Sequence, residues 1–142
     1  MAYAVLADLQ ALWGTNEVQI CSDWDNAGTL NELNVTNCLA AASDEMDRYI
    51  AVRYALPLTA TPDDLVRVCC DIAMYRLCPF AGTLTDQKAQ RYKEALGFLK
   101  DLAAGKATLG AQQDEEIAAV PAQAESYGPP RALTRESMRR LL

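Results

Sequence analysis

"DDLVRVCCDIAMYRLC", residues 63–78, is the stretch on which the fold of this chain depends. Its apolar residues recur at intervals of three or four, which is the spacing of side chains on one face of a helix. The residues of that face are Leu65, Val68 or Cys69, Ile72 and Tyr75. Further apolar side chains nearly encircle the predicted helix, so other elements must cover it on several sides. We therefore expect it to be the central helix of a bundle.

The residues before this helix carry signals for its beginning. Thr61 is suited to be the N-cap, and Pro62 fits the first helical position. Asp63 and Asp64 would then face the positive end of the helix dipole. Pro57 ends the preceding helical pattern because it lacks an amide hydrogen and disfavours helical geometry in the residue before it.

Two short helices are predicted near the N-terminus, separated by Gly14. Apolar residues at helical spacing define the first: Leu6, Leu9 and Trp13. The second would be capped by Thr15 or Asn16 and would bury Val18 and Ile20.

Two longer helices complete the predicted bundle. The first runs from Leu33 to Tyr54, and its seam of alternating four- and three-residue steps comprises Val35, Leu39, Ala42, Met46, Tyr49 and Arg53. The second has Thr85 as N-cap and ends at Gly105, where a helix favours glycine. Its expected apolar face is Ala89, Tyr92, Leu96, Leu99 and Ala103. The chain is therefore predicted to be all-α, a small bundle of four to five helices.

An acidic loop, "CSDWDNAGTLNELN" (residues 21–34), precedes the first long helix. It begins like an EF-hand calcium loop, with matching residues Asp23, Asp25, Gly28 and Leu30. The match fails at Ala27, which offers no side-chain oxygen, and at Asn34, which replaces the bidentate Glu. We expect a helix-to-helix turn in which Gly28 allows the reversal and Asp and Asn side chains bind nearby amides. Calcium binding is the alternative.

Composition limits the classes of function. A chain of 142 residues forms at most one compact domain, and its net charge of -6 speaks against a nucleic-acid-binding surface over the whole body. No apolar run reaches the roughly 18 residues of a membrane span, and Asp8 interrupts the apolar N-terminal stretch. We therefore expect a soluble, unexported protein.

The residue types that usually carry chemistry are scarce. There is no histidine, and the five cysteines show no C-x-x-C spacing, so we expect reduced core thiols rather than a zinc site. These cysteines are Cys21, Cys38, Cys69, Cys70 and Cys78. The close acidic pairs Asp63–Asp64 and Asp44–Glu45 fit exposed helix positions. No nucleophile or phosphate-loop motif is present, so we expect no enzyme, no metal and no cofactor.

The C-terminal part of the chain differs from the bundle. Residues 1–105, the predicted bundle domain, carry 14 acidic and 8 basic residues, a net charge of -6. Residues 106–130 are rich in Ala, Gln, Glu, Gly and Pro and have net charge -3, which predicts an extended arm. Residues 131–142 have net charge +3 and regain helical character, with Thr134 as N-cap.

This last segment is a candidate docking peptide. Its arginines would meet carboxylates on a partner while its apolar side chains are buried. The proposed partner-binding residues are Arg131, Leu133, Arg135, Met138, Arg139, Arg140, Leu141 and Leu142. The alternative is a solvated, frayed terminus.

Four strings identify a resemblance that covers nearly the whole chain: "MAYAVLADL" (1–9), "YIAVRYALPL" (49–58), "LVRVCCDIAMYRL" (65–77) and "RYKEALGFLKDLAAGKATLG" (91–110). Together they resemble the Mu-like prophage protein family, which is related to the head-to-tail connector, or adaptor, proteins of tailed phages. The resemblance implies a dodecameric ring in the neck of the virion, assembled in the bacterial host cytoplasm. Its implied partners are further copies of itself, the portal protein and a neck, stopper or tail protein, with DNA passing through the lumen without specific binding.

Other functions remain open at this point. The nearest is a different neck component, such as a stopper or tail-completion protein, which would differ mainly in its docking partner. A small helical DNA-binding regulator would use a helix-turn-helix around "YALPLTATPDDL" (54–65), although the acidic charge speaks against it.

Overall fold

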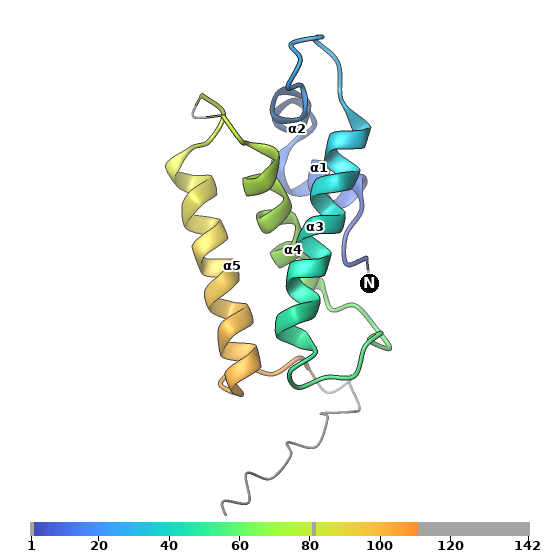
Figure 1. Ribbon diagram of the computed structural model, residues 1–142, viewed down its shortest axis with the longest axis vertical. Helices are drawn as coiled ribbons and strands as arrows, with labels where there is room; N and C mark the ends of the chain where they lie inside the picture. The colour runs from blue at the N-terminus through green and yellow to red at the C-terminus, as the bar shows by residue number, and fades with distance from the viewer. Residues whose placement is uncertain (1, 81, 111–142) are drawn as a thin grey trace, which may run out of the picture.

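The computed structural model describes residues 2–80 and 82–110, and over these residues the regular structure is helical. The five helices are α1 (Leu6–Trp13), α2 (Thr15–Ser22), α3 (Glu32–Ile50), α4 (Asp63–Leu77) and α5 (Asp86–Ala104) (Figure 1). The predicted all-α class with four to five helices is confirmed. No helix within the described ranges is both long enough and apolar enough to cross a membrane.

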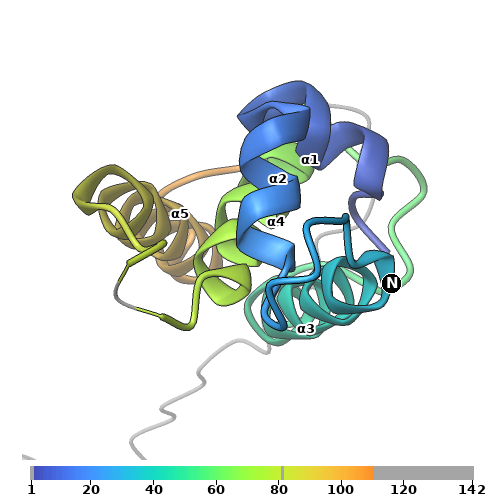
Figure 2. The same ribbon diagram turned by 90° about the horizontal axis from the view of Figure 1, so that it is seen from above.

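Helix α4 lies at the centre of the bundle, as predicted. It contacts each of the other four helices, and the view from above shows it between α5, α3 and the α1–α2 pair (Figure 2). Side chains are buried all around it: Leu65, Val68, Cys69, Cys70, Asp71, Ile72, Ala73, Met74 and Leu77. Tyr75, which we expected on the buried face, is half-buried and stacks on Tyr92 of α5, with the ring centroids 4.1 Å apart.

Helix α3 ends at Ile50, four residues before the predicted end at Tyr54. Tyr54 and Leu58, in the connection that follows the helix, are both buried. At the other end of α3 the side chain of Asn31 accepts a hydrogen bond from the Asn34 amide at 3.1 Å, which caps the helix.

Predictions for two helix starts need correction. Pro62, not Thr61, is the N-cap of α4, because its carbonyl oxygen already accepts the first amides of the helix. Gly14, rather than Thr15 or Asn16, is the N-cap of α2.

The buried face of α2 also differs from the prediction. Ile20 is 61% exposed, because the face that starts at Val18 continues three and four residues later, at Cys21 and Ser22.

The buried face of α5 is rotated by one residue from the predicted one. The residues that are buried are Lys88, Ala95, Leu99 and Leu102, whereas Ala89, Tyr92, Leu96 and Ala103 are half-buried. The predicted N-cap is confirmed, since the Thr85 hydroxyl accepts a hydrogen bond from the Lys88 amide at 3.3 Å.

The described chain continues past α5 along the end of the bundle. Gly105 ends the helix in the left-handed conformation, as its position predicted. Leu109 is buried, and its amide donates a hydrogen bond to the hydroxyl of Tyr54 at 3.1 Å. The rest of the predicted arm, from residue 111 on, and the whole of the predicted docking segment 131–142 lie outside the described residues.

Alanine substitutions at two glycines of the α5 region should change stability in opposite directions. Gly105 has φ +82, so Gly105→Ala should lower the free energy of unfolding by about 1–2 kcal/mol. Gly97 lies inside α5 with nothing near its missing Cβ, so Gly97→Ala should raise it by roughly 0.5–1 kcal/mol. Urea unfolding of the two variants checks this, and a change of the same sign at both positions would contradict it.

Candidate functional site

The residues proposed for docking from the sequence lie outside the described part of the chain. They are Arg131, Leu133, Arg135, Met138, Arg139, Arg140, Leu141 and Leu142. The described bundle was therefore searched for the surfaces and charged groups that could take part in function.

The acidic loop forms a turn that is built from its own side chains. The two carboxylate oxygens of Asp23 accept hydrogen bonds from the amides of Ala27 and Gly28, at 2.8 and 2.7 Å. Asn26 and Gly28 both have positive φ, which reverses the chain. These bonds of an Asp side chain to nearby amides are those expected of a helix-to-helix turn.

Polar groups at the end of α2 fasten this loop to the bundle. The indole nitrogen of Trp24 donates to the carbonyl oxygens of Cys21 and Leu77, both at 2.9 Å, and so joins α2 to the end of α4. The hydroxyl of Ser22 accepts from the Asn31 amide at 3.1 Å. These contacts fix the position at which α3 begins.

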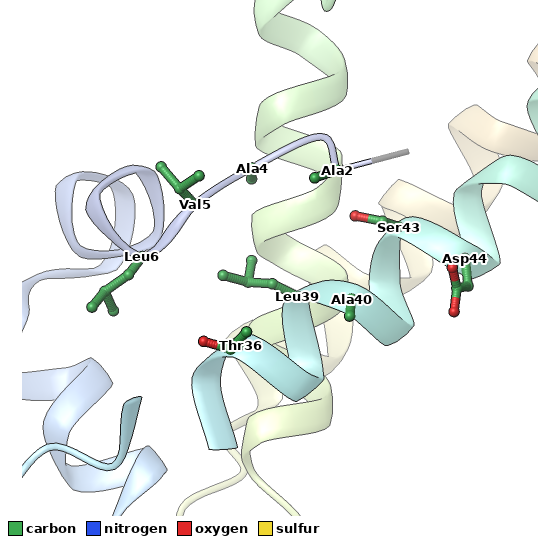
Figure 3. Close-up of a pocket in the computed structure, with 9 residues that line it drawn as sticks. All are labelled: Ala2, Ala4, Val5, Leu6, Thr36, Leu39, Ala40, Ser43 and Asp44. Carbon is green, nitrogen blue, oxygen red and sulfur yellow. The ribbon is translucent and has the colours of Figure 1, made fainter. Parts of the chain in front are cut away.

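An apolar groove lies between the N-terminal segment, residues 2–6, and helix α3 (Figure 3). Its volume is about 390 Å³, and Leu6 and Leu39 extend towards the space between the two elements. Most of its lining residues are small or apolar: Ala2, Ala4, Val5, Leu6, Thr36, Leu39, Ala40, Ser43 and Asp44. A surface of this kind can receive side chains of another polypeptide.

The wall of the groove formed by the N-terminal segment is held in place by Tyr3. The Tyr3 ring is buried, its hydroxyl donates to Asp47 Oδ1 at 2.5 Å, and its amide donates to Ser43 Oγ at 3.4 Å. Burial, followed by the hydrogen bond to Asp47, raises the pKa of the Tyr3 phenol above its ordinary value. The phenol therefore stays protonated and keeps its bond to α3. Val5, two residues on, is left 58% exposed at the edge of the groove.

A buried lysine joins three parts of the chain on the other side of α4. Lys88, in the first turn of α5, is only 2% exposed. Its ammonium group donates to Glu17 Oε1 at 2.5 Å, to the Thr83 carbonyl at 2.7 Å and to Cys21 Sγ at 3.2 Å. Burial alone would lower the pKa of Lys88, but the bonds to Glu17 and Cys21 raise it above the ordinary value. The lysine therefore stays charged and ties α2 to the connection between α4 and α5.

Two thiols lie beside this ammonium group. A hydrogen bond from the Cys21 thiol, together with the charge of Lys88, lowers the pKa of Cys78 to about 7. The same bond, together with burial, raises the pKa of Cys21. Cys78 is thus the thiol of this pair that ionises first as the pH rises. All five cysteines are buried and free, as expected from the sequence.

These features have few signals in the amino-acid sequence. Lys88 has helical spacing to the buried residues Ala95 and Leu99 of α5. This spacing is the one signal in the sequence that places the lysine on the buried face of the helix. The groove combines small residues from two distant segments, and no local pattern in the sequence indicates that these segments meet.

Comparison with known proteins assigns the chain to a family. Residues 3–126 match the family described as Bacteriophage Mu, Gp36, and the chain belongs to this family. The Mu-like prophage FluMu protein gp36 of Haemophilus influenzae is 40% identical over 90 residues, which are 63% of this chain and 62% of that protein. Gene product J of Escherichia phage Mu is 31% identical over 113 residues, 79% of each chain. The resemblance to Mu-like prophage proteins is thus confirmed, and the chain is a bacteriophage protein.

Removal of the buried ammonium group should destabilise the bundle. Lys88→Met leaves the Thr83 carbonyl and the Glu17 carboxylate without their partner, and the free energy of unfolding should fall by about 1–3 kcal/mol. Lys93→Met, at an exposed position of the same helix, is the matched control and should change it by less than about 0.5 kcal/mol. Equal changes in the free energy of urea unfolding for the two variants would show that the bonds of Lys88 do not stabilise the bundle.

The lowered pKa of the Cys78 thiol should be visible in a titration. Ultraviolet absorbance should detect one thiolate that forms near pH 7 in the native protein, is missing in Cys78→Ser, and forms at higher pH in Lys88→Met. The pKa of Cys78 lies below that of an ordinary thiol, so the Cys78 thiolate stabilises the folded state. This contribution to the free energy of unfolding is fully present above the ordinary thiol pKa and is lost as the pH falls through about 7. A native protein whose first thiolate forms only at the ordinary thiol pKa would contradict the described cluster.

Proposed function

We propose that the chain is a head-to-tail connector, or adaptor, protein that forms a ring, a dodecamer, between the portal and the tail or neck components around the DNA channel. Membership in the Mu Gp36 family supports the broader role in phage structure or morphogenesis. The observation that carries the proposal is a helical bundle with an open apolar groove along α3. Such a surface is suited to contacts with other protein chains.

Exposed apolar side chains on several elements favour assembly through more than one face. A closed ring needs two different complementary surfaces on each copy, because each copy contacts one neighbour on either side. Large apolar residues are exposed on α1, α2, α3 and the connecting loops: Val5, Leu12, Ile20, Trp24, Leu33, Val52 and Phe80. These side chains are distributed widely enough to serve two opposite interfaces.

The charge of the bundle is compatible with a DNA channel. Residues 1–105 carry a net charge of -6, and a channel lined with carboxylates would repel a duplex with one phosphate charge per roughly 1.7 Å. DNA could then pass through the lumen without being bound. In this proposal the segment 131–142 is the docking peptide, and the protein belongs to the virion neck.

A second neck component, such as a stopper or tail-completion protein, is the nearest alternative, since it would share the fold and differ in its partner. The DNA-binding regulator is less well supported. The connection between α3 and α4 comprises residues 51–62, which is much longer than the three- to four-residue turn of a helix-turn-helix. Helix α4, which would have to read DNA, is the buried centre of the bundle.

Reconstitution with the portal protein of the same phage tests the proposal. We expect electron microscopy to show rings of the full chain on the portal, and we expect a chain that lacks residues 131–142 to remain folded but to lose portal attachment. A full chain that neither forms rings nor binds the portal would contradict the proposed function. A truncated chain that still attaches normally would contradict only the role of the docking segment.

A further inference from the structure

The wall of the groove formed by α3 has a regular pattern of side chains. Glu32, Thr36, Ala40 and Asp44 follow one another at intervals of four residues, and all four are exposed. They therefore line one stripe that is about 18 Å long. The stripe has a carboxylate at each end and small side chains between, and Leu33, which is 69% exposed, lies beside its first turn.

The floor of the groove allows another helix to approach closely. Ala4, Leu39 and Ser43 are buried there, and Ala2 and Ala40 add only methyl groups at its sides. Small residues let two backbones approach while larger side chains from the incoming helix fill the remaining volume. The surface thus fits an amphipathic helix that has large apolar side chains and positive charges along its edge.

One segment of this chain has these properties. Residues 131–142 would form a helix of about 18 Å, the length of the α3 stripe. Arg131, Arg135 and Arg139 have the four-residue spacing of the stripe. The remaining residues include the large apolar side chains Leu133, Met138, Leu141 and Leu142. The arginines of the segment carry a charge opposite to that of Asp44, in the groove, and of Glu32, one turn of α3 before the groove, and its apolar side chains suit the groove.

The length of chain between the bundle and this segment allows contact with another copy. Residues 111–130 can span roughly 65 Å when extended, which exceeds the length of any helix in the bundle. In a ring, each copy would place its segment on one neighbour and receive the segment of the other, so that every groove is filled when the ring closes.

We propose that the groove between residues 2–6 and α3 binds residues 131–142 of a neighbouring copy of the same chain. The apolar side chains of the segment fill the groove, and its arginines pair with Glu32 and Asp44 at the two ends of the stripe. This inference rests on the proposed ring, because a ring supplies the neighbour. It makes the neighbouring copy the direct partner of residues 131–142, so that the loss of portal attachment on their deletion follows from the loss of the ring.

Photo-crosslinking in the full chain tests the proposal. A short aliphatic diazirine amino acid placed at Ala40 reports on whatever occupies the groove without filling it, and the same group at Gln87, exposed on α5, is the matched control. Copies labelled with heavy nitrogen are mixed with unlabelled copies before assembly, with and without portal protein. We expect crosslinks from position 40 to peptides within 131–142, including pairs with one labelled and one unlabelled partner, and none of these from position 87.

The other outcomes separate this inference from the proposed function. Crosslinks only between peptides of equal label would mean that the segment folds onto its own copy, and crosslinks from position 40 to the portal would mean that the portal fills the groove. Either result overturns the inference while rings on the portal leave the proposed function intact. Absence of both rings and crosslinks overturns both.

A substitution in the groove provides a second measurement. Ala40→Arg places bulk and positive charge on the stripe and should weaken self-association by at least about tenfold, as measured by sedimentation. Ala51→Arg, exposed just past the end of the same helix, should have no such effect. Thermal unfolding of both variants should match the native chain, so that loss of association with Ala40→Arg is assigned to the groove. Unchanged association would overturn the inference.

Discussion

The burial of α4 around most of its circumference is the constraint on which the rest of the structure depends. A helix with apolar side chains on most of its sides is stable only when neighbours exclude water from those faces. Four helices meet this requirement, and each of them contacts α4. The outward faces of these four helices are not constrained by the packing against α4. The groove and the exposed apolar side chains that favour assembly lie on these outward faces and on the connecting segments.

The polar groups at the ends of α4 are fixed by the same packing. Trp24 donates to the last carbonyl groups of α2 and α4, and Lys88 is surrounded by acceptors from α2 and from the loop before α5. An unpaired ammonium group at the position of Lys88 would be costly, so its bonds also determine where α2 lies. On the opposite side, Tyr3 holds the N-terminal segment against α3 and thereby forms the groove.

Local signals in the sequence were sufficient for most of the fold. The apolar circumference of residues 63–78 predicted the central helix, and Thr85 and Gly105 marked the ends of α5 because capping depends on nearby backbone groups. The end of α3 was missed because Tyr54 keeps the helical spacing from Ile50 and is buried although it lies outside the helix. The tie at Lys88 was missed because its partner Glu17 lies 71 residues away, and the groove was missed because it is made of small residues from two segments.

The central claim is that a bundle organised around α4 assembles through the groove formed by residues 2–6 and α3. Hydrogen exchange of the full chain, measured free and in the assembly with portal, is the most direct test. We predict that α4 has the slowest amides in both states and that exchange in residues 2–6 and along the exposed stripe of α3 becomes slower on assembly. Equal exchange of residues 2–6 in the two states, or exchange of α4 as fast as that of α1, would contradict the account.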